Sequence, residues 1–328
     1  MKFIKTLIFS ALIGTCVVIG YGLVYVSQPL SLAHLPLEFS IKSGSSVKSA
    51  AKQMHAAGVL DNDIYFVLLT RLMGHSDQIK SGDYLLEKSI TPLELLEILT
   101  KGLVVKVELT IIEGSTFNQL RDIINQHPKL SHDTQGLAER EILQRIGAAE
   151  TRAEGLFFPD TYRIASGTSD LDLLKQSYVL MRQHLQQSWA ARAPNLLLKY
   201  PYDALILASI VEKETGQSGD RDKIAAVFHN RLRIGMMLQT DPTVIYGMGE
   251  RFKGNIRKRD LTQDTPFNTY TRAGLPPTPI ASPGLAAIEA TLHPAAISAL
   301  YFVARGDGTT QFSDNLNDHN HAVNTFQK

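Results

Sequence analysis

A glutamate near the end of an apolar run is the side chain of this sequence best suited to proton transfer. Residues 202–215 predict a helix, with Asp203 placed to cap it and Glu214 in its last turn. On a helical wheel, Glu214 shares a face with large aliphatic residues such as Leu207, whereas Glu212 falls roughly opposite. A carboxyl held against apolar neighbours has a raised pKa and stays protonated near neutrality, which suits a general acid. The competing interpretation is a solvated glutamate in a charged last turn.

Two polar segments farther along the chain are candidates for a groove beside this acid. Gln239 and Asp241 lie in a short polar run between apolar residues. Asn268 and Tyr270 belong to a region in which six of the fourteen prolines fall between residues 266 and 294, so it is a shaped loop rather than a helix. Polar and aromatic side chains among prolines are typical of a pre-formed groove. We expect these four residues to line it.

A third segment, 154–162, combines aromatic residues with two acids, Glu154 and Asp160. Pro159 excludes a helix interior there. A loop that exposes aromatic rings beside carboxylates is able to hold sugars, because pyranose faces pack on rings and hydroxyls bond to carboxylates. Glu154 and Asp160 are therefore candidates for substrate binding. The competing interpretation is a core loop whose aromatic side chains are simply buried.

The composition limits the class of protein. The chain has 328 residues, with 33 Lys and Arg against 32 Asp and Glu and a net charge of +1, which excludes a strongly basic nucleic-acid binder and an acidic disordered tail. At 44% hydrophobic and 20% charged residues it is a folded protein, long enough for two domains. Cys16 is the single cysteine, so neither an internal disulfide nor a cysteine-based metal site can form.

The N-terminus predicts a membrane anchor. Residues 7–26 carry no charge and are long enough to cross a bilayer as one helix. Lys2 and Lys5 precede this stretch, so the positive-inside rule places a cytoplasmic tip at 1–6 and the rest of the chain outside. We therefore expect a single-pass membrane protein whose larger part lies outside the cytoplasm.

Two details favour an uncleaved anchor. Tyr21 and Tyr25 lie near the outer end of the uncharged stretch, where an aromatic belt is expected. A cleaved signal peptide, the competing interpretation, has a shorter apolar core and a small-x-small cleavage site, which is not evident here. The residues before Cys16, 13–15, are a poor lipoprotein signal, so this cysteine is expected to be an apolar filler.

The residues after the anchor predict an α+β fold in several parts. Residues 38–103 read as a small α/β module of strand, two helices, returning strand and a further helix, with Ile64, Val67, Leu68 and Leu72 as the apolar positions of its second helix. This order resembles a LysM-type module, which binds the N-acetylated sugar backbone of cell walls; the alternative is a packing domain without a ligand. Residues 104–150 predict a strand–helix connector, and 151–328 a larger mixed catalytic domain built around the helix that ends near Glu214.

Several motifs together resemble one known family. They are Leu-Ala-Ser-Ile-Val-Glu-Lys-Glu-Thr at 207–215, Asn-Arg-Leu at 230–232, Leu-Gln-Thr-Asp-Pro-Thr-Val-Ile-Tyr-Gly at 238–247, Asn-Thr-Tyr at 268–270, Gly-Leu-Pro-Pro at 274–277 and Tyr-Phe-Val at 301–303. With the anchor, the LysM-like module and the run at 154–161, they resemble the MltG (YceG-like) endolytic murein transglycosylases over essentially the whole chain. The resemblance implies an inner-membrane enzyme that cuts nascent peptidoglycan strands internally and so terminates glycan elongation. Penicillin-binding synthases are the partners that it suggests.

The resemblance also selects the catalytic residue. The Glu-Thr pair at 214–215 is similar to the Glu-Ser of goose-lysozyme-like lytic transglycosylases, whose glutamate is the lone acid and base, so Glu214 rather than Glu212 is the implied catalyst. A hydrolase usually needs two carboxyl groups. A lytic transglycosylase needs one, because the MurNAc 6-hydroxyl of the substrate is the nucleophile and closes a 1,6-anhydro ring at the cleaved MurNAc-β-1,4-GlcNAc bond. No metal and no cofactor is required.

Three other interpretations remain. Ser49-x-x-Lys52, a Ser-Asp-Asn at 313–315 and a Lys-Ser-Gly at 42–44 imitate the motifs of serine D,D-peptidases, but their order is wrong. His319 and His321 suggest a zinc site without its usual motif. The third is a membrane-anchored scaffold that binds peptidoglycan and recruits cell-wall synthases without catalysis.

Overall fold

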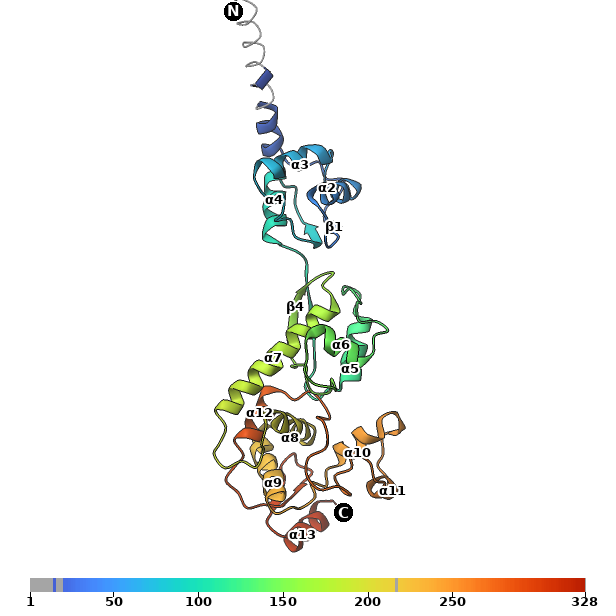
Figure 1. The fold of residues 1–328 in the computed structure, drawn as a ribbon, viewed down its shortest axis with the longest axis vertical. Coiled ribbons are helices and arrows are strands. Elements are labelled where there is room, and N and C mark those ends of the chain that lie inside the picture. The colour runs from blue at the N-terminus through green and yellow to red at the C-terminus, as the bar shows by residue number, and fades with distance from the viewer. Residues whose placement is uncertain (1–13, 16–19, 216–217, 328) are drawn as a thin grey trace, which may run out of the picture. The chain divides into compact units, whose positions relative to one another are not determined.

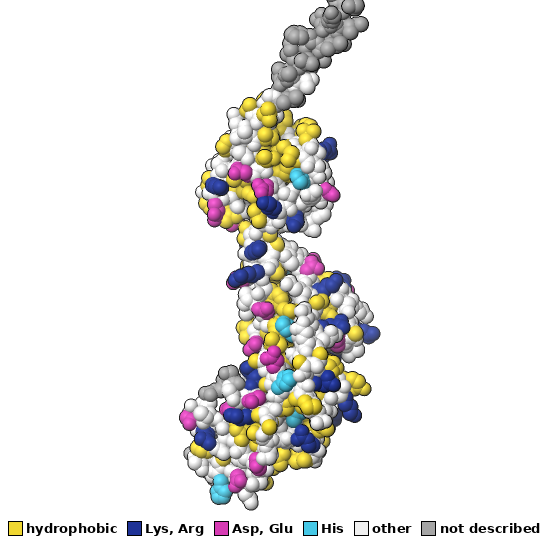
Figure 2. Space-filling model, turned by 90° about the vertical axis from the view of Figure 1, so that its left-hand side faces the viewer, with side chains coloured by type: hydrophobic (Ala, Val, Ile, Leu, Met, Phe, Trp, Pro, Cys, Tyr) yellow, Lys and Arg dark blue, Asp and Glu magenta, His cyan; other side chains and the backbone are white. Residues whose placement is uncertain are grey.

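The computed structural model describes residues 14–15, 20–215 and 218–327 (Figure 1). The chain divides into two compact units, one of residues 1–108 with 163–168 and the other of residues 109–162 with 169–328. Within the described residues, both units combine helices with small two-stranded sheets, so the predicted α+β class is confirmed. On the face drawn in Figure 2, basic and acidic side chains are interspersed.

The first unit has the predicted order of strand, two helices, strand and helix. β1 (Leu37–Ile41) pairs antiparallel with β2 (Gly82–Leu86), with Leu37 opposite Leu86 and Ile41 opposite Gly82. Two helices, α2 (Val47–Ala56) and α3 (Asp63–Leu72), connect the strands, and α4 (Pro92–Lys101) follows. The predicted module 38–103 therefore lies within this unit.

The helix ends of this unit follow from its sequence. The Ser46 side chain accepts a hydrogen bond from the backbone N–H of Ser49 and caps α2. Thr91 and Glu94 cap each other's backbone N–H at the start of α4, and Gly102 ends that helix in the left-handed conformation at φ 67°. These local signals act within four residues, which is why the sequence alone predicts them.

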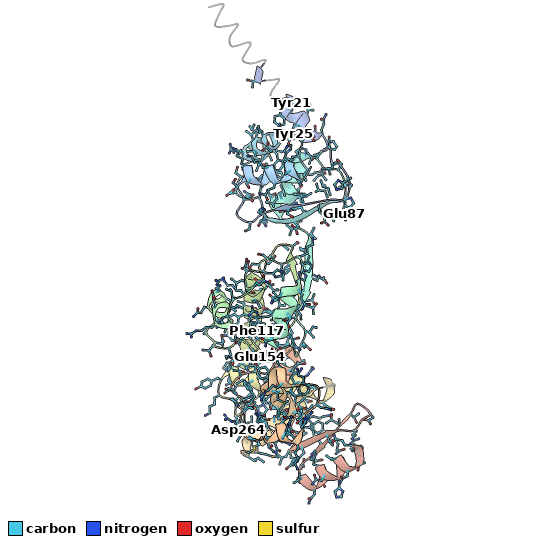
Figure 3. All side chains as sticks on the ribbon, turned by 90° about the vertical axis from the view of Figure 1, so that its right-hand side faces the viewer. Tyr21, Tyr25, Glu87, Phe117, Glu154 and Asp264 are labelled. Carbon is cyan, nitrogen blue, oxygen red and sulfur yellow. The ribbon has the colours of Figure 1, made fainter. Side chains whose placement is uncertain are left out.

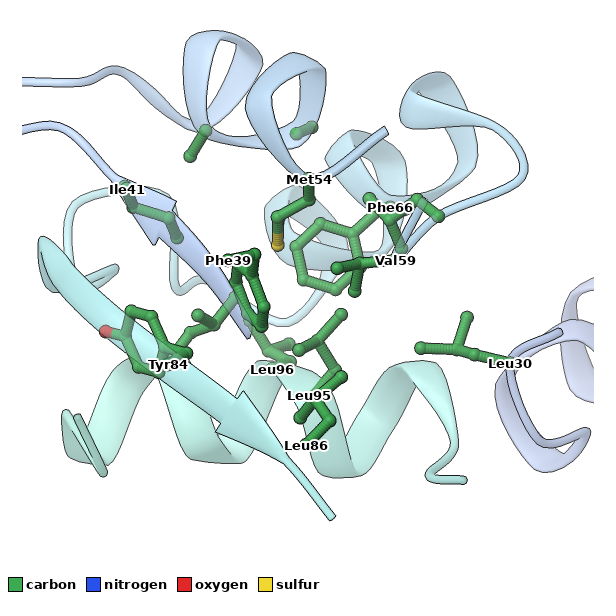
Figure 4. Packing of buried hydrophobic residues seen from close by; sticks show 14 of the residues in the cluster. Leu30, Phe39, Ile41, Met54, Val59, Phe66, Tyr84, Leu86, Leu95 and Leu96 are labelled. Atoms are coloured by element: carbon green, nitrogen blue, oxygen red, sulfur yellow. The ribbon is translucent and has the colours of Figure 1, made fainter. Parts of the chain in front are cut away.

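The core of the first unit lies between the sheet and the helices (Figure 4). Phe39 and Tyr84 stack across the two strands at 5.2 Å, and Met54 and Phe66 are fully buried beside them. This core is large enough to fix the relative positions of α2, α3 and the sheet, because each apolar side chain in it is removed from water.

The buried face of α3 is not the one that the apolar stripe suggests. Ile64, Leu68 and Leu72, which repeat every four residues, are 61%, 52% and 81% exposed. Phe66 and Leu69 instead supply the buried face. A helix that is apolar on both sides carries no periodicity that distinguishes its inner face from its outer one.

The strand and the helix predicted after the first module are both present. β3 (Lys106–Thr110) pairs with β4 (Thr161–Ala165), and in the second unit Thr116 and Gln119 form a capping box at the start of α5 (Phe117–Gln126). A shorter helix, α6 (Glu139–Ile146), follows before the 154–162 segment.

The central element of the second unit is α8 (Pro201–Glu214), in which every residue from Ala204 to Val211 is buried. It packs chiefly against α12 (Leu285–Leu292), and also against α7 (Asp170–Ala190) and α9 (Arg221–Arg233). The remaining elements are η1 (Ser218–Asp220), α10 (Asp241–Met248), η2 (Gly249–Arg251), α11 (Lys258–Thr262), β5 (Tyr301–Ala304), β6 (Thr310–Ser313) and α13 (Leu316–Phe326).

The start of α8 differs in detail from the prediction. The helix begins at Pro201, so Asp203 is its third residue and not its N-cap. The Asp203 carboxylate still accepts hydrogen bonds from the backbone N–H groups of Lys199 and Tyr200, at 2.9 and 3.0 Å. The residue therefore caps the helix from within its first turn.

The predicted membrane span lies largely outside the described residues. Of residues 7–26, the structure describes 14–15 and 20–26, and residues 20–27 are helical. In the part of the chain that is described, no helix has both the length and the apolar character needed to cross a bilayer.

Candidate active site

A cavity of about 610 Å³ lies at the C-terminal end of α8. Its wall is formed by α8, α9, the loops before α10 and after α11, the β5–β6 hairpin and α13. The polar and aromatic side chains that line it include Glu214, Arg231, Gln239, Asp241, Tyr270, Tyr301 and His319. A cavity of this size is typical of a small-molecule or oligosaccharide site. The structure therefore brings the predicted acid together with three of the four predicted groove residues.

Glu214 is held in the last turn of α8, with its position fixed by the burial of that helix on all sides. Burial is the main cause that raises the pKa of the Glu214 carboxyl above its ordinary value. The Asp241 charge raises this pKa too, whereas the Thr240 hydroxyl and the Arg231 charge lower it. The balance keeps the carboxyl protonated to higher pH than an exposed glutamate, as a general acid requires.

Thr240 is the direct partner of the acid, and sequence reasoning did not select it. Its hydroxyl donates a hydrogen bond to Oε1 of Glu214. The Thr240 backbone N–H donates to Oγ1 of Thr269 at 3.1 Å, and Gln239 N–H donates to the Thr269 carbonyl at 3.1 Å. These bonds hold Gln239 at φ 47°, a left-handed conformation that a residue with a β-carbon rarely adopts. The polar run in the sequence indicates this segment as a site. Only the hydrogen bonds to Thr269 show how the segment is held and which of its side chains reaches Glu214.

Asp241 and Tyr270 form a second polar pair in the cavity. The Tyr270 hydroxyl donates to Oδ1 of Asp241 at 2.6 Å. Burial, followed by this hydrogen bond, raises the pKa of Tyr270, so the phenol stays neutral and remains a donor. Gln239 lines the same cavity. These three side chains offer both donors and acceptors to a ligand.

Asn268 is not among the residues that line the cavity. It is 1% exposed, and its side-chain amide donates to the carbonyls of Leu261 and Gln263 at 3.0 and 2.8 Å. Its Oδ1 accepts the backbone N–H of Tyr270 at 2.8 Å. The contacts of Asn268 thus fix the loop that presents Tyr270.

Glu154 and Asp160 also lie outside the cavity. Glu154 is 6% exposed and accepts hydrogen bonds from the backbone N–H of Phe117 at 2.9 Å and from the Tyr246 hydroxyl at 3.0 Å (Figure 3). Phe157, from the same segment, is buried and stacks on Phe117. Asp160 is exposed and accepts the N–H of the next residue. This is the arrangement that the core-loop interpretation expects.

Arg231 is a second residue of the site that sequence reasoning missed. It is 7% exposed, and its guanidinium donates to the carbonyls of Leu238 and Leu300 at 2.6 and 2.7 Å. The same group lies over the Tyr301 ring at 5.2 Å. Arg231 therefore joins α9 to the segment before Gln239 and to the start of β5. The Asn-Arg-Leu motif at 230–232 is the sequence feature that could have indicated Arg231, but it does not show which residues Arg231 contacts.

Glu212 has a different environment from Glu214. Its side chain is 8% exposed, accepts the backbone N–H of Gly284 at 3.0 Å and lies 3.7 Å from Arg221. It does not line the cavity. The two glutamates therefore point in different directions, as the helical wheel predicts, and the Glu212 contacts are structural.

The two histidines of the alternative zinc site do not lie in the same place. His319 lines the cavity and stacks on Tyr301 at 5.0 Å, whereas His321 does not line it. Among the described residues, no group of three or more His, Cys, Asp or Glu side chains is placed to hold a metal ion.

Replacing Thr240 with valine is expected to raise the pKa of Glu214, since the substitution removes a hydrogen bond that favours the carboxylate. The limb of the pH–rate profile that falls as Glu214 loses its proton then moves to higher pH by about one unit, the size of a charge-assisted hydrogen bond. Rates of glycan cleavage by the wild type and T240V, measured from pH 4 to 9, test this. Thr278→Val, at a buried threonine outside the cavity, serves as the control and leaves the limb in place.

Replacing Glu154 with glutamine is expected to reduce the loss of stability with rising pH. Burial raises the pKa of Glu154 from 4.5 to about 7, so the folded state holds a proton that the unfolded state releases. Stability is therefore full below pH 4.5 and declines up to about pH 7, by about 3 kcal/mol from this group. Urea unfolding of wild type and E154Q at pH 5 and 8 measures the difference. The control Glu250→Gln, at an exposed glutamate, leaves the decline unchanged, and an equal decline in E154Q contradicts the assignment.

Comparisons with known proteins identify the family of this chain. The YceG-like family matches residues 39–325. An endolytic murein transglycosylase of Bacillus subtilis (strain 168) is 29% identical over an alignment of 308 positions, which covers 88% of this chain and 84% of that protein. One of Streptococcus pneumoniae (serotype 2, strain D39) is 30% identical over a gapped alignment of 362 positions, which covers 98% of this chain but 64% of that longer protein.

A solved structure is similar as well. The 2.6 Å crystal structure of a yceG-like protein from Listeria monocytogenes has a TM-score of 0.54 and 28% sequence identity, covering 87% of this chain and 98% of that one. The family match spans both compact units and includes every residue named in the cavity. The chain therefore belongs to the YceG-like family, in which sequence analysis placed it.

Proposed function

We propose that this protein is an endolytic murein transglycosylase that cleaves MurNAc-β-1,4-GlcNAc bonds inside peptidoglycan strands and leaves 1,6-anhydroMurNAc ends. The observation that carries the proposal is the half-buried Glu214 carboxyl in the wall of the cavity, with its pKa raised and one oxygen held by Thr240. The names of the Bacillus and Streptococcus relatives support the reaction class. The enzyme is a lytic transglycosylase, a carbon–oxygen lyase.

The chemistry needs one carboxyl group that gives a proton in the first step and takes a different proton in the second. Protonated Glu214 donates to the glycosidic oxygen, the bond from that oxygen to C1 of MurNAc breaks, and GlcNAc leaves with a 4-hydroxyl group. The resulting carboxylate takes the proton of the MurNAc 6-hydroxyl, whose oxygen then bonds to C1. Glu214 ends protonated as it began, and no water is consumed.

The other polar groups of the cavity hold the sugar. Gln239, Asp241 and Tyr270 present donors and acceptors beside the acid, and each lines the cavity. Thr240 keeps one oxygen of Glu214 occupied, so the other oxygen is the one that faces the reaction. Hydrogen bonds fixed before the substrate arrives lower the barrier, because they need no rearrangement during the reaction.

The cellular setting extends the proposal beyond the described residues. The uncharged stretch 7–26 after Lys2 and Lys5 supports a single inner-membrane span with the catalytic unit in the periplasm. An anchored enzyme of this kind meets glycan strands as synthases release them, so its cuts terminate elongation. Penicillin-binding synthases are its proposed partners, and the LysM-like module its proposed contact with the sugar backbone.

Mass spectrometry of cleaved glycan strands tests the activity. Purified full-length protein is incubated with uncrosslinked strands, and the new ends are identified by mass. Anhydro ends that first appear on fragments of many lengths support endolytic transglycosylation. Reducing ends, which are 18 Da heavier because they contain water, identify a hydrolase instead. Absence of any cleavage favours the non-catalytic scaffold.

A further inference from the structure

The first unit exposes an apolar face along α3. Ile64, Leu68 and Leu72 form a stripe of one residue per helical turn, and all three are more than half exposed. Met73, at the end of the same helix, is 49% exposed. The opposite face of α3 is already buried in the core of the unit. An exposed apolar stripe of this kind marks a site of contact with another molecule or with a membrane.

The N-terminal helical residues 20–27 lie against this helix. The rings of Tyr21 and Tyr25 are 5.9 and 5.6 Å from the ring of Tyr65 on α3, and Figure 3 shows the first two at one end of the unit. Tyr25 and Val26 also pack against the core of the unit. Two neighbouring residues on the outer side, Leu23 and Val24, are 63% and 48% exposed. The end of the N-terminal helical segment therefore packs on the first unit, in contact with α3 and with the core.

We propose that this face, made of Ile64, Leu68, Leu72 and Met73, rests in the outer interface of the bilayer that the N-terminal segment enters. The inference rests on the proposed membrane anchor. It adds a second point of membrane contact, which holds the first unit against the lipid surface.

The bilayer is favoured as the occupant because this chain itself leads into it. The residues beside α3 are the last of the uncharged stretch 7–26, which the proposed anchor places in lipid. Tyr21, Tyr25 and Tyr65 form one aromatic cluster, and tyrosine is enriched where a membrane meets water. An apolar stripe at the depth of such a belt meets acyl chains and headgroups, as in helices that lie in the membrane plane. Figure 2 shows hydrophobic side chains gathered on the upper part of this unit.

Fluorescence quenching by brominated lipids tests the proposal on the full-length protein. Cys16, the native cysteine, is replaced by serine, and a bimane label is placed through L68C or L72C. The matched control is L85C on β2, since Leu85 is also an exposed leucine. It lies two residues from Glu87, which Figure 3 shows at the other end of the unit from Tyr21 and Tyr25. In vesicles with bromines at the top of the acyl chains, we expect at least twofold quenching at positions 68 and 72 and none at 85.

A label on the native Cys16 tests the proposed anchor independently of the α3 proposal that rests on it. A bimane on Cys16 of the wild-type chain is quenched by bromines deep in the acyl chains if the segment is inserted. Quenching at Cys16 without quenching at 68 or 72 overturns the α3 proposal alone. No quenching at Cys16 overturns the anchor, and the α3 proposal with it.

Dilution of the protein in lipid distinguishes a second copy from the bilayer. If the bimane fluorescence at positions 68 and 72 changes as the protein-to-lipid ratio falls but does not depend on bromine, the face contacts a second copy of the chain. That result overturns the proposal. Urea unfolding of L68C and L72C that matches the wild type shows that the labelled variants are folded.

Discussion

Glycan cleavage is expected to disappear in the Glu214→Gln variant while the protein remains folded. The amide cannot donate a proton to the glycosidic oxygen, and it cannot take one from the 6-hydroxyl. General acid–base groups contribute about 10²- to 10⁴-fold to a rate, and here one group acts in both steps, so the loss is expected at the upper end of that range. Anhydro ends counted by mass spectrometry measure it.

The fold of this variant is expected to be intact because glutamine has the shape of the glutamate it replaces. The Thr240 hydroxyl still finds an acceptor in the amide oxygen. The substitution also removes a carboxyl whose ionisation burial opposes. Unfolding by urea at pH 7 is therefore expected to need the same concentration as for the wild type, or slightly more.

Glu212→Gln is the matched control, two residues away on the same helix. Glu212 accepts the Gly284 N–H and pairs with Arg221, so its loss affects stability and leaves cleavage in place. Near-normal cleavage by E214Q, or loss only in E212Q, overturns the assignment of the acid. If E214Q is inactive on glycan but the cells keep normal glycan length, the scaffold interpretation gains support.

Replacing Arg231 with lysine is expected to reduce both stability and activity, although the charge is kept. A lysine carries a single ammonium in place of the planar fork that reaches the carbonyls of Leu238 and Leu300 and covers the Tyr301 ring. At least one buried carbonyl loses its partner, at a cost of about 1–3 kcal/mol. Because Leu238 directly precedes Gln239 and Thr240, we expect the cleavage rate to fall by more than about tenfold as Glu214 loses its alignment.

A comparison of R231K with Arg231→Met distinguishes the effect of the guanidinium's hydrogen bonds from the effect of its positive charge. Both variants lose stability, but only methionine removes the positive charge that lowers the pKa of Glu214. The falling limb of the pH–rate profile is therefore expected to move upward in R231M alone. Arg233→Lys, at an exposed arginine bonded to Asn230, is the control and changes neither property. A stable and fully active R231K shows that the guanidinium does not organise the site.

Local patterns in the sequence determined much of this protein. The capping signals at Ser46 and Thr91, the long apolar helix and the orientation of Glu214 away from Glu212 all follow from residues within one or two turns. The polar run beside Gln239 and the proline-rich loop that carries Tyr270 were recognised in the same way, and both contribute to the cavity. Such features are predictable because a helix or turn depends on its own residues.

Tertiary structure alone decided which of these residues meet. Thr240 lies 26 positions from Glu214, and Arg231 lies 69 from the Leu300 carbonyl that it binds. Asn268 and Glu154 are polar residues whose sequence context resembles that of groove residues, yet their hydrogen bonds go to other parts of the chain and not into the cavity. Periodicity identifies the face of an element, but what lies opposite that face depends on how distant segments pack. The side chains that hold and tune Glu214 are Thr240, Asp241 and Arg231, from two segments outside its own helix, and no local pattern connects these segments with it.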